Sequence, residues 1–189
     1  MTKTVWTFGL IAGAILSAMM LATMPFIDRI GFDTGEVIGY STMVAAFLLI
    51  FFGIRSYRDN QAGRTVSFGR AFVVGLLINL VASACYVATW QVVYYKLVPD
   101  FGEKYAAHTI EKERAGGATE AQIAAKTAQM QKFREMYRNP VFNVGITFLE
   151  VFPIGSIVSL VSAGILRRRR KNGAIRPEGA AAGISAGVD

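Results

Sequence analysis

The stretch that decides the fold lies near the C-terminal end, where residues 141–166 read VFNVGITFLEVFPIGSIVSLVSAGIL. Glu150 is the only charged residue among these 26 positions. A hydrocarbon core about 30 Å thick needs about 20 residues of α-helix, because each residue adds about 1.5 Å along the axis. This stretch is therefore long and apolar enough to cross a lipid bilayer as one helix.

Three further stretches meet the same condition. Residues 5–26 and 71–95 carry no charged side chain, and residues 37–54 are also uncharged although slightly short. The bilayer interior offers no water to the backbone, so each spanning segment must form its hydrogen bonds internally as a helix. We therefore predict an all-α integral membrane protein with one four-span domain over residues 1–171.

The composition agrees with this fold class. Of the 189 residues, 53% are hydrophobic and 17% are charged, whereas soluble domains contain about 45–50% and about 25%. Little polar chain remains for a separate catalytic domain. The sequence also contains no nucleotide-binding loop, catalytic triad or cluster of metal ligands. We expect no enzymatic activity, no cofactor and no bound metal.

The distribution of charge predicts the orientation. The chain has 20 basic and 13 acidic residues, for a net charge of +7. Two basic clusters flank the spans, one between the second and third spans and one after the fourth: Arg55, Arg58, Arg64, Arg70, and Arg167, Arg168, Arg169, Arg170, Lys171. Loops rich in Lys and Arg stay in the cytoplasm. We expect both termini there, contacts between these clusters and anionic lipids, and no nucleic-acid partner.

One alternative concerns the first span, which could be a cleaved signal peptide. Its 22 uncharged residues exceed the roughly 7–15 residues of an apolar signal region. We therefore expect the segment to remain as a membrane span.

The polar segment 99–140 would then lie outside the cytoplasm. Gly116 and Gly117 divide it, and Thr119 with Gln122 has the spacing of a helix-capping box. The following positions place one side chain per turn on a single helix face: Ile123, Thr127, Met130, Phe133 and Tyr137. We predict an amphipathic helical hairpin, packed on itself or lying on the headgroups.

Two roles remain open for this hairpin. It could simply cap the bundle, or residues 101–138 could contact an envelope protein or a second copy of the chain. The only histidine, His108, has Glu111 one turn away. Two ligands do not make a zinc site, which usually needs three or four protein groups. We expect His108 to be an ordinary surface residue.

Small residues recur at four-residue spacing in three spans. Helices pack closely in lipid where small side chains let the backbones approach. We therefore predict a tight bundle, possible oligomer contacts, or alternatively a substrate path along these positions: Gly9, Gly13 and Ser17; Gly75, Asn79 and Ser83; Gly155, Ser159 and Ala163.

Three intramembrane residues stand out as functional candidates. Asn79 must find a hydrogen-bond partner inside the bilayer or bear a desolvation cost. Glu150 lies roughly 5 Å from the middle of its span, where an ionised side chain costs about 2.5–3.5 kcal/mol. Pro153 has no backbone N–H and leaves the carbonyl of Leu149 without its usual donor. This set could serve structural hydrogen bonding or form a proton or ion site.

Several stretches that combine polar and apolar positions resemble a known family. They are FFGIRSYRD at residues 51–59, PDF at 99–101, KFREMYRNP at 132–140 and TFLEVFPIG at 147–155. Over roughly residues 3–171 the chain resembles the bacterial membrane family catalogued as domain of unknown function 4199. The resemblance implies about four spans and the cytoplasmic membrane of a bacterium, and it implies no catalytic residue or activity.

These observations favour a non-enzymatic inner-membrane protein that acts as a structural or interaction module of the envelope. The alternative is a small oligomeric transporter or channel that uses Glu150 as an intramembrane acidic site. Residues 172–189, which are rich in Gly and Ala, lie outside the resemblance, and we expect this tail to be disordered.

Overall fold

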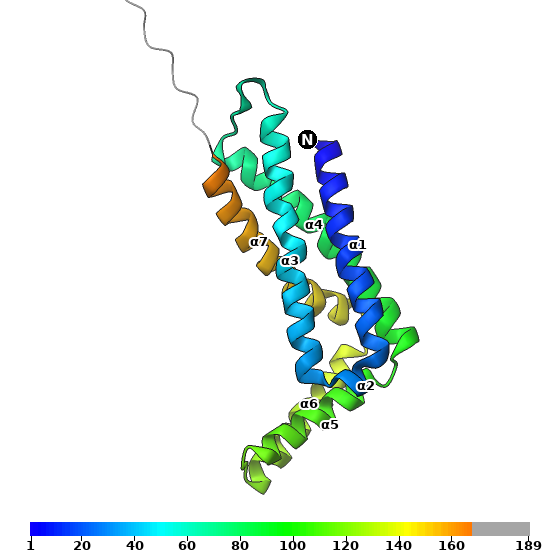
Figure 1. The fold of residues 1–189 in the computed structure, drawn as a ribbon. Helices are drawn as coiled ribbons and strands as arrows, with labels where there is room; N and C mark the ends of the chain where they lie inside the picture. Colours follow the sequence, from blue (N-terminus) through cyan, green and yellow to red (C-terminus); the bar gives the residue numbers. More distant parts are fainter. Residues whose placement is uncertain (168–189) are drawn as a thin grey trace, which may run out of the picture.

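Four long helices form a bundle in the computed structural model, which describes residues 1–167 (Figure 1). Two shorter helices project from one end of this bundle. In chain order the elements are α1 (Thr2–Thr23), η1 (Met24–Phe26), α2 (Ile27–Ile30), α3 (Phe32–Asp59), η2 (Ala62–Arg64), α4 (Phe68–Val92), η3 (Val93–Leu97), α5 (Phe101–Ala115), α6 (Glu120–Tyr137) and α7 (Pro140–Leu166). Within residues 1–167 no β-strand forms. The expected disorder of residues 172–189 and the placement of Arg168, Arg169, Arg170 and Lys171 lie outside the described residues.

The predicted all-α membrane fold is confirmed. Four helical segments are long and apolar enough to cross a membrane: Thr2–Ile30, Phe32–Asp59, Phe68–Leu97 and Pro140–Leu166. They extend beyond the predicted apolar stretches because a helix continues past the hydrocarbon region, where its polar side chains meet the membrane interface.

The connection between the first two spans is shorter than the sequence suggests. The predicted spans 5–26 and 37–54 leave ten residues between them, but α3 already begins at Phe32, and Gly31 joins it to α2. Gly31 adopts φ of 83°, a conformation that favours glycine because other residues clash there. This tight turn places Glu36 on the first turns of a membrane helix.

The interior of the bundle holds large apolar side chains such as Phe47, Ile50 and Ile78 together with small and polar ones, and many further large apolar side chains face outward. Helix α4 contacts α1, α3 and α7, and its Asn79 and Ser83 are fully buried. Large apolar residues on the outside of α1, α3 and α7 remain exposed, including Ile11, Ile15, Val44, Leu48, Ile157 and Ile165. This arrangement suits a bundle whose surroundings are lipid, because hydrocarbon gives no reason to bury large apolar groups.

The small residues of the first span lie where α1 crosses α4. A side-chain Cβ at Gly9 would approach Val81 Cβ to 2.7 Å, and one at Gly13 would approach Cys85 Cβ to 2.7 Å. Both separations are too short for carbon atoms that are not bonded. One helical turn further along, the hydroxyl of Thr89 donates a 2.7 Å hydrogen bond to Ser17 Oγ.

A similar contact joins α4 to α7. A Cβ at Gly75 would lie 2.9 Å from Ser159 Cβ, and Ser159 and Ala163 are fully buried. The Asn79 amide donates to the Phe152 carbonyl at 2.8 Å and to Ser156 Oγ at 3.3 Å. These bonds satisfy a polar group that would otherwise be costly inside the membrane.

The two ends of the bundle differ. The N-terminus, the connection between α3 and α4 and the end of α7 lie at one end, and α5 and α6 lie at the other (Figure 1). Helices α5 and α6 pack against each other. The predicted capping box is confirmed, since Thr119 and Gln122 exchange both of its hydrogen bonds. Asn139 caps α7 by accepting from the N–H of Val141 at 2.9 Å.

Candidate functional site

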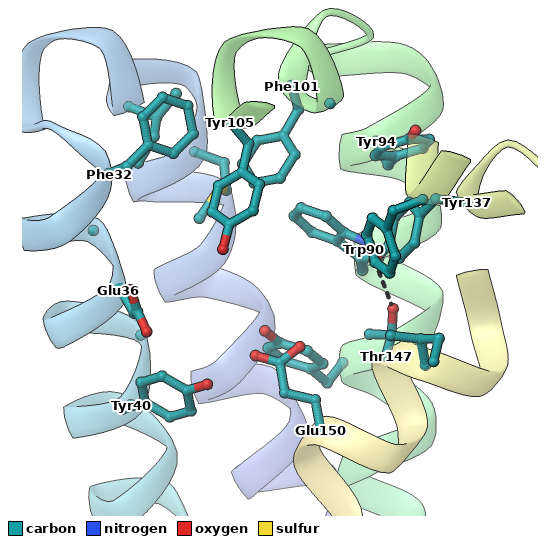
Figure 2. A pocket seen from close by; sticks show the side chains of 18 of the residues that line it. Phe32, Glu36, Tyr40, Trp90, Tyr94, Phe101, Tyr105, Tyr137, Thr147 and Glu150 are labelled. Atoms are coloured by element: carbon teal, nitrogen blue, oxygen red, sulfur yellow. Dashed lines mark hydrogen bonds between the residues drawn. The ribbon is translucent and has the colours of Figure 1, made fainter. Parts of the chain in front are cut away.

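A cavity of about 280 Å³ lies between the α5–α6 hairpin and the ends of the spans that adjoin it. Helices α3, α4 and α7 provide its sides, and α5 and α6 cover it (Figure 2). Met24 and Ile27, at the end of the first span, complete the wall. We call this space the hairpin chamber. Its volume lies just below the range of about 300–1,000 Å³ that is usual for small-molecule sites.

Aromatic side chains from five helical elements form a large part of the wall. Some of the rings contact each other directly: the Trp90 and Phe101 ring centroids are 5.0 Å apart at 87°, and those of Tyr94 and Tyr137 are 5.2 Å apart at 73°. Such edge-to-face pairs are favourable arrangements of aromatic rings. Nine aromatic residues line the chamber: Phe32, Tyr40, Tyr86, Trp90, Tyr94, Phe101, Tyr105, Phe133 and Tyr137.

A π-helical turn, η3, shapes one side of this wall. The N–H of Val98 bonds to the carbonyl of Val93 at 2.8 Å, five residues back, in place of the usual four. The extra residue changes the direction of the following side chains, and such turns are frequent at functional sites. Tyr94 lies within this turn and faces the chamber.

A hydrogen-bonded network holds the rings of α4 and α6 against α7. Trp90 Nε1 donates to the Tyr137 hydroxyl at 2.9 Å, and this hydroxyl lies 3.3 Å from Thr147 Oγ1 (Figure 2). Burial raises the pKa of Tyr137 above its usual value, so the phenol stays neutral. Nearby, Gln91 donates a 2.8 Å bond to the buried amide of Asn143. The rings of Trp90 and Tyr137 are therefore held in place by hydrogen bonds.

Two carboxylates lie at the chamber, one on each of two neighbouring helices. Glu36 comes from α3 and Glu150 comes from α7, and Figure 2 shows Tyr40 below Glu36 on α3 with its hydroxyl directed toward Glu150. Among residues 1–167 neither carboxylate has a basic group within 4.0 Å. The chamber has one basic residue in its lining, Arg134, and its Nη2 lies 2.6 Å from Glu103 Oε1.

Ion pairs attach the hairpin to the start of α3. Lys104 of α5 lies 2.5 Å from Asp28, and Lys112 lies 2.6 Å from Asp33. His108 Nε2 lies 3.4 Å from the same carboxylate, and its ring stacks on Phe32 with centroids 5.2 Å apart. His108 was expected to be an ordinary surface residue, but its ring contacts both Asp33 and Phe32. These interactions join α5 to α2 and the start of α3.

Only one of the three predicted intramembrane candidates faces the chamber. Glu150 lines it, whereas Asn79 lies deeper between α4 and α7. Pro153 is exposed on the surface of α7.

The predicted small residues lie at helix crossings and outside the chamber lining. Four predicted basic residues, Arg55, Arg58, Arg64 and Arg70, lie at or near the ends of α3 and α4 away from the hairpin, and Arg167 follows α7.

Sequence reasoning missed Glu36 and the aromatic wall. Glu36 was counted as a loop residue because it precedes the uncharged stretch at Val37. The aromatic residues come from segments far apart in the chain, so no local motif contains them. One signal was available, because the predicted face of α6 carries Met130, Phe133 and Tyr137, and all three line the chamber.

Comparison with known proteins adds the family. The profile of the family described as Protein of unknown function (DUF4199) matches residues 7–168. This region contains most of the first span, the other three spans and the hairpin. Searches of curated proteins and of solved structures found no match. The match covers most of the sequence, and the chain therefore belongs to the DUF4199 family of proteins of unknown function.

Proposed function

We propose that this chain is a non-enzymatic multi-pass protein of the bacterial inner membrane that holds a small solute in the hairpin chamber. The observation that carries the proposal is the chamber itself, a space of about 280 Å³ with an intramembrane carboxylate, Glu150, at its wall. A bundle that served only as a scaffold would have no need of such a space, because protein interiors are otherwise closely packed. The position of Glu150 favours the solute-handling alternative over a purely structural module.

The distribution of charge supports the proposed orientation. Arg55, Arg58, Arg64 and Arg70 belong to the end of the bundle opposite the hairpin, and Lys- and Arg-rich loops stay in the cytoplasm. Both termini would then be cytoplasmic. The chamber would lie in the outer half of the membrane, and a solute would enter it from the extracytoplasmic side.

The chemistry of the lining supports binding rather than catalysis. The residues that line the chamber include no His, Cys or Lys, which are common nucleophiles and proton carriers. Thr147, the one aliphatic hydroxyl of the lining, donates within its own helix to the Asn143 carbonyl at 2.8 Å. A solute would therefore be bound or passed on unchanged.

Cysteine accessibility tests both the chamber and the orientation. In a Cys85→Ala chain, Gly39→Cys would place a thiol in the chamber, where a new Cβ meets no atom within 4 Å. We expect the thiol to react with a membrane-impermeant methanethiosulfonate, either cationic or anionic, added outside intact cells. Gly69→Cys, which is equally free of contacts, is the matched control at the opposite end.

The control should react only after the cells are opened. Failure of both reagents to reach Gly39→Cys, before and after opening, would show that the chamber is closed to solutes. Reaction of Gly39→Cys only from the cytoplasmic side would reverse the proposed orientation.

A second candidate function concerns the outer surface of the hairpin. Helices α5 and α6 project beyond the bundle (Figure 1), and most side chains between Glu111 and Gln122 are exposed. This projecting part could contact an envelope protein or a second copy of the chain. Crosslinking in native membranes from a cysteine at Glu120, compared with the Cys85→Ala parent, tests this role.

A further inference from the structure

We propose that the solute of the hairpin chamber is a small organic cation, an amine or quaternary ammonium compound. The inference rests on the proposed function, since it assigns a ligand class to the same chamber. Three properties of the chamber carry it: the aromatic wall, the two carboxylates without a basic partner, and the volume.

The aromatic wall provides the first argument. Figure 2 shows the rings of Trp90, Tyr105 and Tyr40 around one common space. The face of an aromatic ring is electron-rich and attracts a cation within about 6 Å, most strongly for Trp. Cages built from several such rings are a known way of recognising quaternary ammonium groups. A metal ion, which prefers oxygen, nitrogen or sulfur ligands, would make little use of this wall.

The charges provide the second argument. Glu36 and Glu150 both border the chamber, and in residues 1–167 neither has a basic side chain within salt-bridge distance. The one basic residue of the lining, Arg134, lies 2.6 Å from Glu103, which offsets its charge. An anionic solute would meet two like charges, and a neutral one would gain no charge interaction with either carboxylate. A cation would be attracted by both carboxylates.

The volume provides the third argument. About 280 Å³ accommodates a compact ammonium compound but not an extended polymer. Gly35 and Gly39 on α3 have no side chain at the wall beside Glu36, and a Cβ at Gly39 would meet open space. Gly39 therefore leaves room near Glu36 where the charged end of a ligand would lie.

The two tryptophans of the chain make the test specific. Trp6 lies exposed on α1, and Trp90 lines the chamber. In a Trp6→Phe chain, purified in detergent, the tryptophan fluorescence therefore comes from Trp90 in the chamber alone. We would titrate choline, its uncharged isostere 3,3-dimethylbutan-1-ol, and acetate. The first two compounds share their shape and differ in charge.

We expect choline to change the Trp90 emission saturably and the uncharged isostere to bind at least about tenfold more weakly. Glu150→Gln and Glu36→Gln should each weaken choline binding about three- to tenfold and leave the isostere unaffected. Glu111→Gln, outside the chamber, is the matched control and should behave like the parent chain. Far-UV circular dichroism and gel filtration verify that each variant is folded.

Tyr40 tests the contribution of the rings. Tyr40→Phe retains the ring and should bind choline like the parent chain, whereas Tyr40→Leu should weaken choline binding about threefold or more. A change that affects choline and the isostere equally would indicate lost packing rather than a lost cation contact.

Several results would overturn the inference. These are equal binding of choline and the isostere, stronger binding of acetate, and no response to choline. The comparison of choline with its isostere needs no charge variant, so it decides the matter even if those variants misfold. Reaction of Gly39→Cys with the external thiol reagents would in these cases keep the chamber as a solute site of another class. Failure of that reaction would overturn the proposed function as well.

Discussion

Gly155 and Asn79 form the contact between α4 and α7 that is most sensitive to substitution. A methyl group at Gly155 would overlap the side-chain amide of Asn79. Asn79 is fully buried and donates to Phe152 and Ser156 on α7, so it cannot turn away without losing both bonds. The substitution Gly155→Ala should therefore separate the two helices or displace the amide.

The magnitude follows from the terms involved. Overpacking a well-packed site costs about 1–3 kcal/mol, and replacing glycine by alanine within a helix returns about 0.5–1 kcal/mol. Gly155→Ala should thus destabilise the fold by about 1–2 kcal/mol. Asn79→Ala removes two interhelical hydrogen bonds, each worth about 0.6 kcal/mol on average in membranes. It also leaves Ser83 without the acceptor that now lies at 3.2 Å.

The double variant decides whether these two residues contact each other as described. With Asn79→Ala in place, the new methyl group at Gly155 meets no amide, so the clash disappears. We expect the double variant to be about as stable as Asn79→Ala alone, which corresponds to a coupling free energy of about 1–2 kcal/mol. The free energy of unfolding can be measured by circular dichroism in detergent micelles with increasing dodecyl sulfate.

Gly145→Ala is the matched control, because a Cβ there meets no atom within 4 Å. It should leave stability unchanged or raise it slightly. If the costs of Gly155→Ala and Asn79→Ala simply add to within about 0.5 kcal/mol, the described contact is wrong.

Four further predictions concern the other contacts. Gly13→Val should collide with Cys85, 2.7 Å from the new Cβ, and lower unfolding stability by about 1–3 kcal/mol; unchanged stability would mean that α1 and α4 are further apart. Asp33→Asn removes the pairs to Lys112 and His108. Because an exposed ion pair contributes about 0.2–1 kcal/mol, hydrogen exchange in α5 should become a few-fold faster, and high salt should have the same effect on the parent chain. Unaltered exchange would mean that the aromatic contacts alone attach the hairpin. Thr119→Ala removes the capping box and should cost about 1 kcal/mol in the first turn of α6, seen as faster exchange there but not in α5. The hydrogen bond between Lys104 and Asp100 lowers the pKa of Asp100 and raises the pKa of Lys104. Thermal stability should therefore fall when acid protonates Asp100 near its lowered pKa and when alkali deprotonates Lys104 near its raised pKa. A stability maximum at either extreme of pH would contradict this pairing.

Local sequence properties determined the spans, the hairpin and its cap. An uncharged run of about 20 residues can only be a helix in lipid, whatever surrounds it, so residues 141–166 identified a span without reference to the rest of the chain. The capping box at Thr119 depends on residues three positions apart and was therefore equally visible. The repeated small residues at Gly9 and Gly155 indicated close packing because glycine allows helices to approach in any bundle.

The chamber could not be derived in this way, because it depends on which faces of distant helices meet. Glu36 and Glu150 are more than a hundred positions apart in the sequence, and Trp90, Phe101 and Tyr137 belong to three different helices. The turn at Gly31 and the π-helical turn at Tyr94 set the direction of side chains that hydrophobicity leaves undetermined. The sequence by itself determined which four segments are long and apolar enough to cross the membrane, whereas the rotation of each helix, and with it the chamber, was decided by long-range packing in the tertiary structure.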